Sequence, residues 1–215
     1  MNEIRVFYKK TGNMKFISHL DMNRLMTRAI KKAGVPVWYT EGFNPHPYMT
    51  FSMPLSLGHE SYCESFDIRL VEECDANSLV ARFNEVLPKG IEITSIAPAV
   101  NKPTDITKAV YKIVFYDVDE NFCAKLAAFL GRENIIVEKT GKKGKITQIN
   151  LAEKILAKDI AEADGNCTLC VALPSGTTEN INPALLIGAF SDTMLEMPCY
   201  DIIREQLFCG EEEYK

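Results

Sequence analysis

Two hydrophobic periodicities alternate along the first hundred residues, and their order restricts the fold more than any other feature of the sequence. Residues 4–10 place Ile, Val and Tyr at every second position, as half-buried strands do. Residues 18–33 instead repeat apolar side chains every three or four positions, which is typical of one buried helix face. Similar patterns predict further strands at 35–40, 48–57, 64–70 and 91–98 and a second helix at 75–90. The order is β-α-β-β-α-β, with one middle strand broken in two.

The same order recurs after a polar stretch, NKPTDITKA, which lacks an apolar period and is interpreted as a linker at residues 101–109. Strand patterns occur at VYKIVFYD, NIIVEKT, KITQINL, CTLCVALPSG and YDIIREQLF, and helix patterns at DENFCAKLAAFLGR and NPALLIGAFSDTML. We therefore predict an α+β protein of two tandem, packed ferredoxin-like domains, residues 1–100 and 110–215. In each domain both helices would cover one sheet face and leave the other free for a partner.

Ser18 precedes Asp21 by three residues, which predicts either a capping box at the start of the first helix or an acid, Asp21, in its first turn. His19 lies at the helix start, where the helix dipole disfavours a charged imidazolium. A neutral histidine there can act as a base, a metal ligand or a hydrogen-bond donor to a phosphate. Alternatively, His19 only ties the end of the helix to the sheet.

The opposite face of this helix is basic. It carries four cations, Arg24, Arg28, Lys31 and Lys32, of which the first three follow i, i+4, i+7 spacing. Such a stripe suits phosphate contacts, although it is equally typical of a solvated helix face. The segment before it contains Lys15 and no acid between residues 4 and 20, which favours the phosphate-binding interpretation.

Residues 41–47, EGFNPHP, predict a stiff loop. Each proline fixes its own φ and biases the preceding residue, Asn44 or His46, toward extended conformations. Ordering this loop on binding would therefore cost little entropy. Glu41, Asn44 and His46 offer hydrogen bonds and Phe43 offers a stacking face, which suits a nucleic-acid base or a small anionic ligand.

Histidine and cysteine patterns do not define a metal or cofactor site. The candidate metal set is His19, His46 and His59 with Asp21 or Glu60, but no pair has the i, i+4 spacing of a helical site. Only Cys167 and Cys170 among the seven scattered cysteines form a CxxC pair, and no second pair follows. We therefore assign no metal, interpret the cysteines as structural, and expect no cofactor of the protein's own.

Charge is distributed unevenly. The net charge is −5, but residues 1–50 hold eight Lys and Arg against three Asp and Glu, so this segment carries +5 and the rest −10. A local basic region indicates a local anionic partner. The lysines of KTGKKGK, residues 139–145, would either reach a phosphate backbone or form a solvated turn. The acidic GEEEYK, residues 210–215, would either contact a partner protein or form a disordered end.

Membrane and export signals do not emerge from the sequence. No apolar run approaches the roughly 18 residues of a membrane helix, and MNEIRVFYKK lacks the apolar core of a signal peptide. We expect a cytoplasmic protein with no membrane partner.

Residues 15–61, from KFISHLD through GFNPHP to PLSLGHES, resemble the start of the radical-SAM-linked family. Its members are bacterial domains of unknown function that occur alone or fused behind a radical SAM enzyme. The resemblance implies the stand-alone type, which works with a separate radical SAM protein. It also implies a link to RNA, because such partners are associated with RNA modification, and it implies no DNA specificity.

These observations lead to the hypothesis of an accessory module that holds RNA or another anionic ligand for a partner enzyme. The expected ligand-binding residues are Lys15, His19, Asp21, Arg24, Arg28, Lys31, Glu41, Phe43, Asn44 and His46. One alternative is a metal-independent RNA-processing enzyme with His19 or His46 as general base. The other is a protein-interaction subunit that binds no ligand.

Overall fold

The chain divides into two compact units in the computed structural model, which describes residues 2–140 and 146–215. Unit 1 comprises Met1–Ile106 and Glu211–Lys215, and unit 2 comprises Thr107–Gly210. The predicted C-terminal domain, residues 110–215, therefore differs from unit 2 at its end, because the last five residues belong to unit 1. The predicted linker, 101–109, contains a short 3-10 helix, η2 (Pro103–Asp105), and the first residues of a strand.

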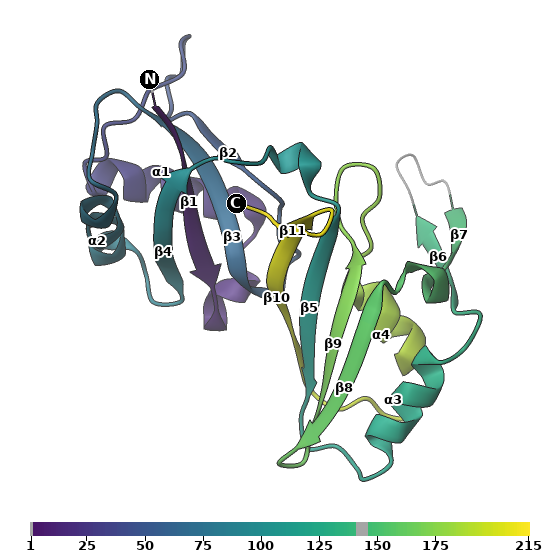
Figure 1. The fold of residues 1–215 in the computed structure, drawn as a ribbon. Coiled ribbons are helices and arrows are strands. Elements are labelled where there is room, and N and C mark those ends of the chain that lie inside the picture. Colours follow the sequence, from purple (N-terminus) through teal and green to yellow (C-terminus); the bar gives the residue numbers. More distant parts are fainter. Residues whose placement is uncertain (1, 141–145) are drawn as a thin grey trace. The chain divides into compact units, whose positions relative to one another are not determined.

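Unit 1 is a mixed α+β unit with both α-helices on one side of its strands (Figure 1). Its elements are β1 (Asn2–Lys10), η1 (Gly12–Phe16), α1 (His19–Lys32), β2 (Met49–Phe51), β3 (Glu60–Leu70), α2 (Ala76–Val86), β4 (Ile91–Pro98) and β11 (Glu212–Glu213). β1 pairs antiparallel with β3 and β4, and β2 pairs antiparallel with β3.

Two of the strands predicted in unit 1 were too long. Residues 35–40 make only isolated bridges through Val37 and Tyr39, since Pro36 lacks an N–H and restricts the residue before it. The strand predicted at 48–57 is limited to β2, which ends before Pro54. Proline cannot donate to the ladder of a strand.

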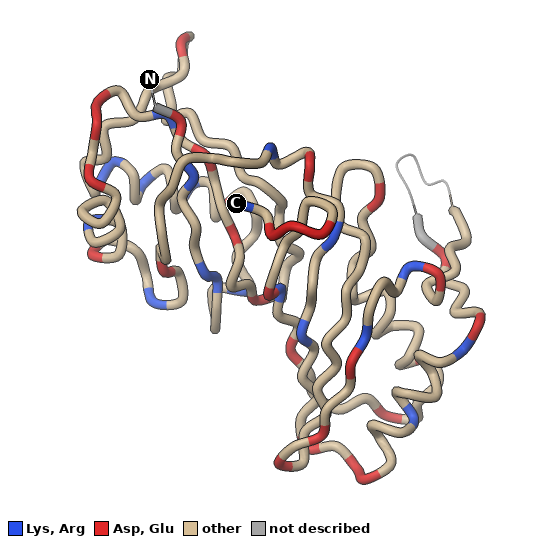
Figure 2. Tube along the Cα trace, in the orientation of Figure 1, with Lys and Arg blue, Asp and Glu red and all other residues tan. Residues whose placement is uncertain are grey.

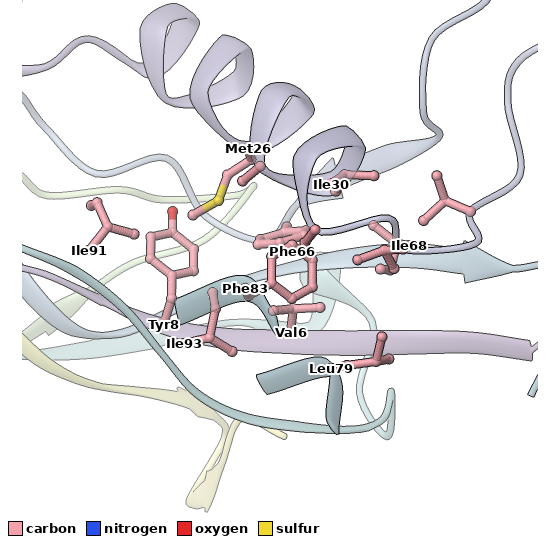
Figure 3. Close-up of a cluster of buried hydrophobic side chains, with 14 of the residues drawn as sticks. Val6, Tyr8, Met26, Ile30, Phe66, Ile68, Leu79, Phe83, Ile91 and Ile93 are labelled. Carbon is pink, nitrogen blue, oxygen red and sulfur yellow. The ribbon is translucent and has the colours of Figure 1, made fainter. Parts of the chain in front are cut away.

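The core of unit 1 lies between the helices and one face of the sheet (Figure 3). Alternate residues of β1, Val6 and Tyr8, point into it, and Phe66 of β3 lies among them fully buried. The predicted buried face of α1 is confirmed at Met22, Met26, Ala29 and Ile30. Burial of this face fixes which side of α1 remains outward, and that side is the basic one.

The other face of this sheet carries a buried ion pair. Arg5 is fully buried and donates to both carboxylate oxygens of Asp67, at 2.7 and 2.8 Å. Its third nitrogen donates to the carbonyl oxygen of Lys215 at 2.8 Å, and its guanidinium lies 4.3 Å from the ring centroid of Tyr214. The Tyr214 hydroxyl lies 2.7 Å from Oγ of Ser52.

Residues 211–215 therefore cover the sheet where the ion pair lies. A buried ion pair must be enclosed and fully hydrogen-bonded, and Tyr214 and Lys215 complete that environment. The prediction of a free sheet face was wrong for this part of the sheet. Of the two interpretations of GEEEYK, the disordered end does not hold, since Tyr214 is buried.

Unit 2 is also α+β (Figure 1). Its elements are β5 (Lys108–Phe115), α3 (Phe122–Leu130), β6 (Ile136–Thr140), β7 (Ile146–Asn150), η4 (Leu151–Lys154), β8 (Ala157–Ala163), β9 (Asn166–Pro174), α4 (Pro183–Ser191) and β10 (Tyr200–Cys209). The sheet order is β10-β5-β9-β8, with antiparallel pairing throughout. Aromatic contacts between Phe115, Phe122 and Phe190 link this sheet to α3 and α4.

The middle strands of unit 2 were predicted correctly as strands of a hairpin but were placed in the wrong sheet. The predicted pair NIIVEKT and KITQINL forms a separate two-stranded hairpin, β6–β7. In the main sheet, the position beside β9 is taken by β8 instead. Most side chains of β8 are exposed, so its sequence shows no apolar alternation. The hairpin tip, residues 141–145 of KTGKKGK, lies outside the described residues.

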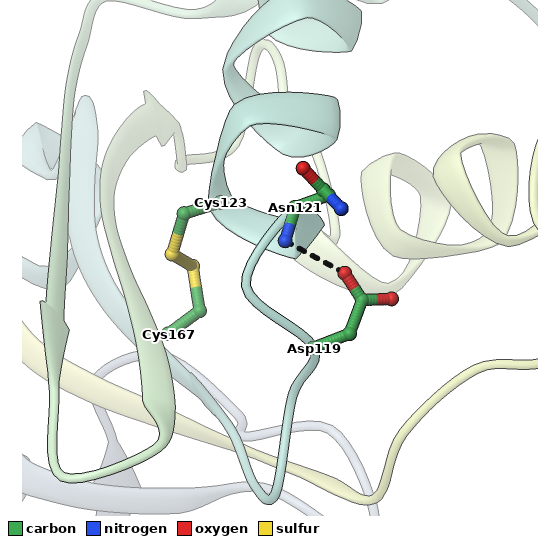
Figure 4. The surroundings of a disulfide bond; sticks show 4 residues. All are labelled: Asp119, Asn121, Cys123 and Cys167. Atoms are coloured by element: carbon green, nitrogen blue, oxygen red, sulfur yellow. Dashed lines mark hydrogen bonds between the residues drawn. A yellow bond between two sulfur atoms is a disulfide. The ribbon is translucent and has the colours of Figure 1, made fainter.

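A disulfide joins Cys123 of α3 to Cys167 of β9, with the two Cα atoms 6.0 Å apart (Figure 4). Cys167 is thus structural, as predicted, but its partner lies 44 residues away rather than in the CxxC pair. Cys170 has a free thiol, and three positions along a strand place it on the face opposite Cys167. Within the described chain no helix is long and apolar enough to cross a membrane.

Candidate functional site

The N-terminus of α1 is capped by the Ser18 side chain, with Asp21 as the acid of its first turn. Ser18 Oγ accepts a hydrogen bond from the Asp21 backbone N–H at 3.1 Å and donates to the Asp21 carboxylate at 2.8 Å. Arg24 donates to the other carboxylate oxygen at 3.1 Å. The hydrogen bond from Ser18, followed by that from Arg24, lowers the pKa of Asp21. Ser18 therefore caps the helix, and Asp21 orients Arg24.

A groove of about 420 Å³ runs between α1 and the residues that end α2. It is lined by Ile17, Asp21, Arg24, Leu25, Arg28, Ala29, Lys32, Val86, Leu87 and Pro88. Arg24, Arg28 and Lys32 form a basic wall on α1 at i, i+4, i+8 spacing, and the apolar residues 86–88 form the wall opposite. Figure 2 shows basic positions following one another along α1. Asp21 is the one acidic residue among these lining residues.

Arg24 and Arg28 were both expected to bind the ligand, and both line the groove. The third cation of the groove is Lys32, whereas the sequence predicted Lys31. The Lys31 ammonium lies instead 6.0 Å from the ring centroid of Tyr39, at the C-terminal end of α1. The difference arises because the second wall is built by residues 86–88, whose position relative to α1 is a tertiary contact. Helical spacing alone could not distinguish Lys31 from Lys32.

His19 lies outside this groove, over a separate small pocket. Its ring contacts Phe51 edge-on with centroids 5.0 Å apart, and the pocket also involves the buried Lys10 and Glu64. Lys10 Nζ donates to the carbonyl oxygen of Ile17 at 3.0 Å and so ties the end of β1 to the start of α1. The pocket volume of about 10 Å³ is that of roughly one water molecule.

The loop at 41–47 is ordered by its own hydrogen bonds. The backbone N–H of Thr40 donates to the carbonyl oxygen of His46 at 2.9 Å, and Thr40 Oγ1 accepts from the His46 N–H at 3.2 Å. His46 Nδ1 lies 3.1 Å from both Thr40 Oγ1 and the carbonyl oxygen of Asn44. One ring nitrogen is thus engaged inside the loop, while Phe43 is fully exposed and Glu41 is exposed beside it.

His46 and His19 lie at different ends of unit 1. The loop follows Val37 and Trp38, which bond near Leu70 and Arg69 at the end of β3. His19 contacts Phe51, which pairs with Phe66 further back along β3. The predicted residues therefore form two groups, one on α1 and one on the loop, rather than a single pocket.

Lys15 and Phe16 precede α1 in η1. The Lys15 ammonium lies 5.3 Å from the centroid of the Phe16 ring, which is 63% exposed. Sequence reasoning missed Phe16, because an isolated aromatic residue is common on any surface. It placed Lys32 on the basic face of α1 but did not count it among the ligand-binding residues, because Lys32 is off the i, i+4, i+7 register. In the part of the chain that the structure describes, no group of three His, Cys, Asp or Glu side chains is arranged to hold a metal.

The fold and groove define a two-unit α+β protein with a cationic groove in its first unit. By family, the chain belongs to the group described as "Uncharacterized protein conserved in bacteria (DUF2344)", whose model matches residues 3–183. This confirms the expectation of a bacterial domain of unknown function. No curated protein matches the sequence.

Among solved structures, the chain is similar to a chain of the "Crystal Structure of a Cbf5-Nop10-Gar1 Complex" at 7% identity and a TM-score of 0.52. The match covers 95% of this chain but only 48% of the other, so this protein spans about half of that chain's length. At this identity the likeness concerns the fold alone. An unknown protein from Galdieria sulphuraria matches at 14% identity over 99% of this chain and 98% of the other, but its TM-score of 0.30 supports no common fold.

Proposed function

We propose that this protein is an accessory module that binds RNA or a related anionic ligand in the groove beside α1. One observation carries the proposal: Arg24, Arg28 and Lys32 line one wall of an open groove that contains a single acid, Asp21. Successive members of this row are separated by four residues, or about 6 Å along the helix axis. That spacing is comparable to the separation of successive phosphates on a nucleic-acid strand.

The chemistry of the wall suits phosphate oxygens. Guanidinium groups donate paired hydrogen bonds to phosphate, and the Arg24 side chain, 62% exposed, is oriented by Asp21 before any ligand arrives. The apolar lining residues Leu25, Ala29 and Leu87 would contact the less polar parts of the ligand. An exposed pair such as Arg24–Asp21 contributes little to stability, so a phosphate can compete for the arginine.

The proposal includes no catalytic step for either histidine. His19 lies over a pocket too small for a phosphate, and one ring nitrogen of His46 is engaged in its own loop.

We propose a separate radical SAM protein as the partner enzyme. This part of the proposal rests on the resemblance of residues 15–61 alone. The ferredoxin-like assignment of both units also belongs to this proposal, supported by the strand neighbours β4-β1-β3 with β2 on β3, and β10-β5-β9-β8.

The test is the salt dependence of RNA binding. Wild-type protein should bind a short single-stranded RNA with an affinity that falls as salt rises. Arg24→Ala plus Arg28→Ala should lower the affinity strongly and reduce the log–log salt slope by about 1.4, since each single-strand phosphate contact contributes about 0.7.

The matched control is Lys125→Ala plus Arg132→Ala, which removes the same charge from exposed positions at α3 of unit 2. Its affinity and slope should equal those of the wild type. Equal losses in the two double variants would show that only overall charge matters, and would contradict a site in the groove.

A further inference from the structure

Three exposed apolar side chains gather where α1 begins. Phe16 is 63%, Leu20 59% and Leu57 64% exposed. Leu20 lies four residues before Arg24 and so continues the row of the basic wall along the helix surface. Phe16 precedes Ile17, which lines the groove, and Leu57 precedes Gly58, whose N–H donates to the Lys15 carbonyl at 2.8 Å. The cationic groove therefore has an apolar, partly aromatic end.

This combination separates nucleic-acid ligands by their strandedness. A duplex would present only its sugar–phosphate surface here, because its base faces are already stacked. An unpaired base has a free π-face, and exposed aromatic rings beside a cationic groove are the usual platform for such bases. The Lys15 ammonium near the Phe16 ring adds a positive charge at the point where the strand would leave the platform.

We propose that the ligand of the groove is single-stranded RNA, with one unpaired base stacked on Phe16 and the adjoining phosphates on Arg24, Arg28 and Lys32. This inference rests on the proposed function and names its substrate class. The three cations span about 12 Å along α1, which corresponds to two or three nucleotides of an extended strand. The stiff loop at 41–47, with its exposed Phe43, takes no part in the stacking, because it lies at the other end of unit 1.

The experiment compares Phe16→Ala, Phe16→Trp and Phe43→Ala by fluorescence anisotropy. The probes are a labelled RNA of about ten nucleotides and the same sequence as a duplex. Wild-type protein should prefer the single strand. Phe16→Ala should lose about tenfold in single-strand affinity with an unchanged salt slope, while Phe16→Trp and Phe43→Ala should bind like the wild type. Because Phe16 is mostly exposed, the variants should retain the wild-type circular dichroism spectrum.

The outcomes separate the inference from the function on which it rests. If wild-type protein binds neither RNA with salt dependence, the proposed function fails. If the protein binds both RNAs equally, or Phe16→Ala binds like the wild type while Arg24→Ala plus Arg28→Ala does not, only the inference is overturned. Equal competition by polyglutamate of matched charge would also overturn it, because the groove would then take an acidic protein segment.

Discussion

Unit 1 holds arginines in two environments that differ in burial and in hydrogen bonding. Arg5 is fully buried, donates to both oxygens of Asp67 and to the Lys215 carbonyl, and lies against Tyr214. Arg24 and Arg28 are exposed on α1 and line an open groove. The hydrogen bonds of Arg5 are directed into the protein, whereas the arginines of α1 point toward a space where a ligand can enter.

The difference teaches which charges to assign to folding and which to binding. A buried ion pair is costly to break because the remaining charge has no solvent. Exposed charges contribute little to stability, so the row of cations on α1 is a candidate for ligand binding rather than for folding. Variants of the buried region should therefore change the stability of the protein, whereas variants of the exposed region should change its affinity for the ligand.

The largest expected effect is on stability. Asp67→Ala leaves the buried Arg5 guanidinium without its carboxylate and should lower the free energy of unfolding by about 3–5 kcal/mol. Urea denaturation followed by circular dichroism measures this change. Arg28→Ala serves as the exposed counterpart and should change stability by less than about 0.5 kcal/mol. Similar effects of the two substitutions would remove the distinction between the regions.

Tyr214→Phe should cost about 1 kcal/mol, because it removes the hydrogen bond between the hydroxyl and Ser52 while keeping the ring against Arg5. Burial raises the pKa of Tyr214 above its ordinary value of 10.0. The folded state thus favours the neutral phenol, and this contribution is complete below pH 10.0 and is lost as pH rises through the folded-state pKa. Alkaline denaturation should show this loss for the wild type and not for Tyr214→Phe.

Ser18→Ala tests whether a change at α1 can alter the stability of the protein without altering RNA binding. Loss of the cap should lower stability by about 1 kcal/mol, while Arg24 and Arg28 remain and the salt slope of RNA binding stays unchanged. The pKa of Asp21 is lowered in the folded protein, chiefly by Ser18, so its contribution is present above pH 3.8 and fades as pH falls through the folded-state pKa. Thermal melts at neutral and acidic pH should therefore differ more for the wild type than for the variant.

The smallest effect distinguishes neighbouring lysines. Lys32→Ala should weaken RNA binding a few-fold and reduce the salt slope by about 0.7, because Lys32 lines the groove. Lys31→Ala should leave the slope unchanged, since Lys31 lies near Tyr39 instead. The reverse ranking, measured by salt titration of the two variants, would place the binding surface on the side of α1 predicted from the sequence.

Local signals made most of unit 1 predictable. The Ser18–Asp21 cap and the buried face of α1 are encoded within about one helix length, and both are confirmed. β8 was not predictable, since its side chains are mostly exposed and carry no alternation. The contact of residues 211–215 with Arg5 could not be predicted either, because no local sequence pattern marks a tyrosine at the end of an acidic segment as buried.

The candidate site was predictable in its chemistry but not in its extent. The sequence placed Arg24, Arg28, Lys31 and Lys32 on one face, and the structure shows that Lys32 rather than Lys31 lines the groove opposite residues 86–88. It grouped His46 and Phe43 with these residues because they are close in the sequence. Pairing of Trp38 with the far end of β3 separates the loop from the start of α1, and such pairing is determined by register rather than by sequence distance.

The most direct measurement is a salt titration of single-stranded RNA binding by Arg24→Ala plus Arg28→Ala, beside Lys125→Ala plus Arg132→Ala and the wild type, with unfolding free energies measured on the same samples. A functional groove predicts that only the α1 variant loses affinity and about 1.4 of the slope, and that all three proteins are equally stable within about 0.5 kcal/mol. Wild-type affinity and slope in the α1 variant, or a loss that follows its stability, would contradict that function.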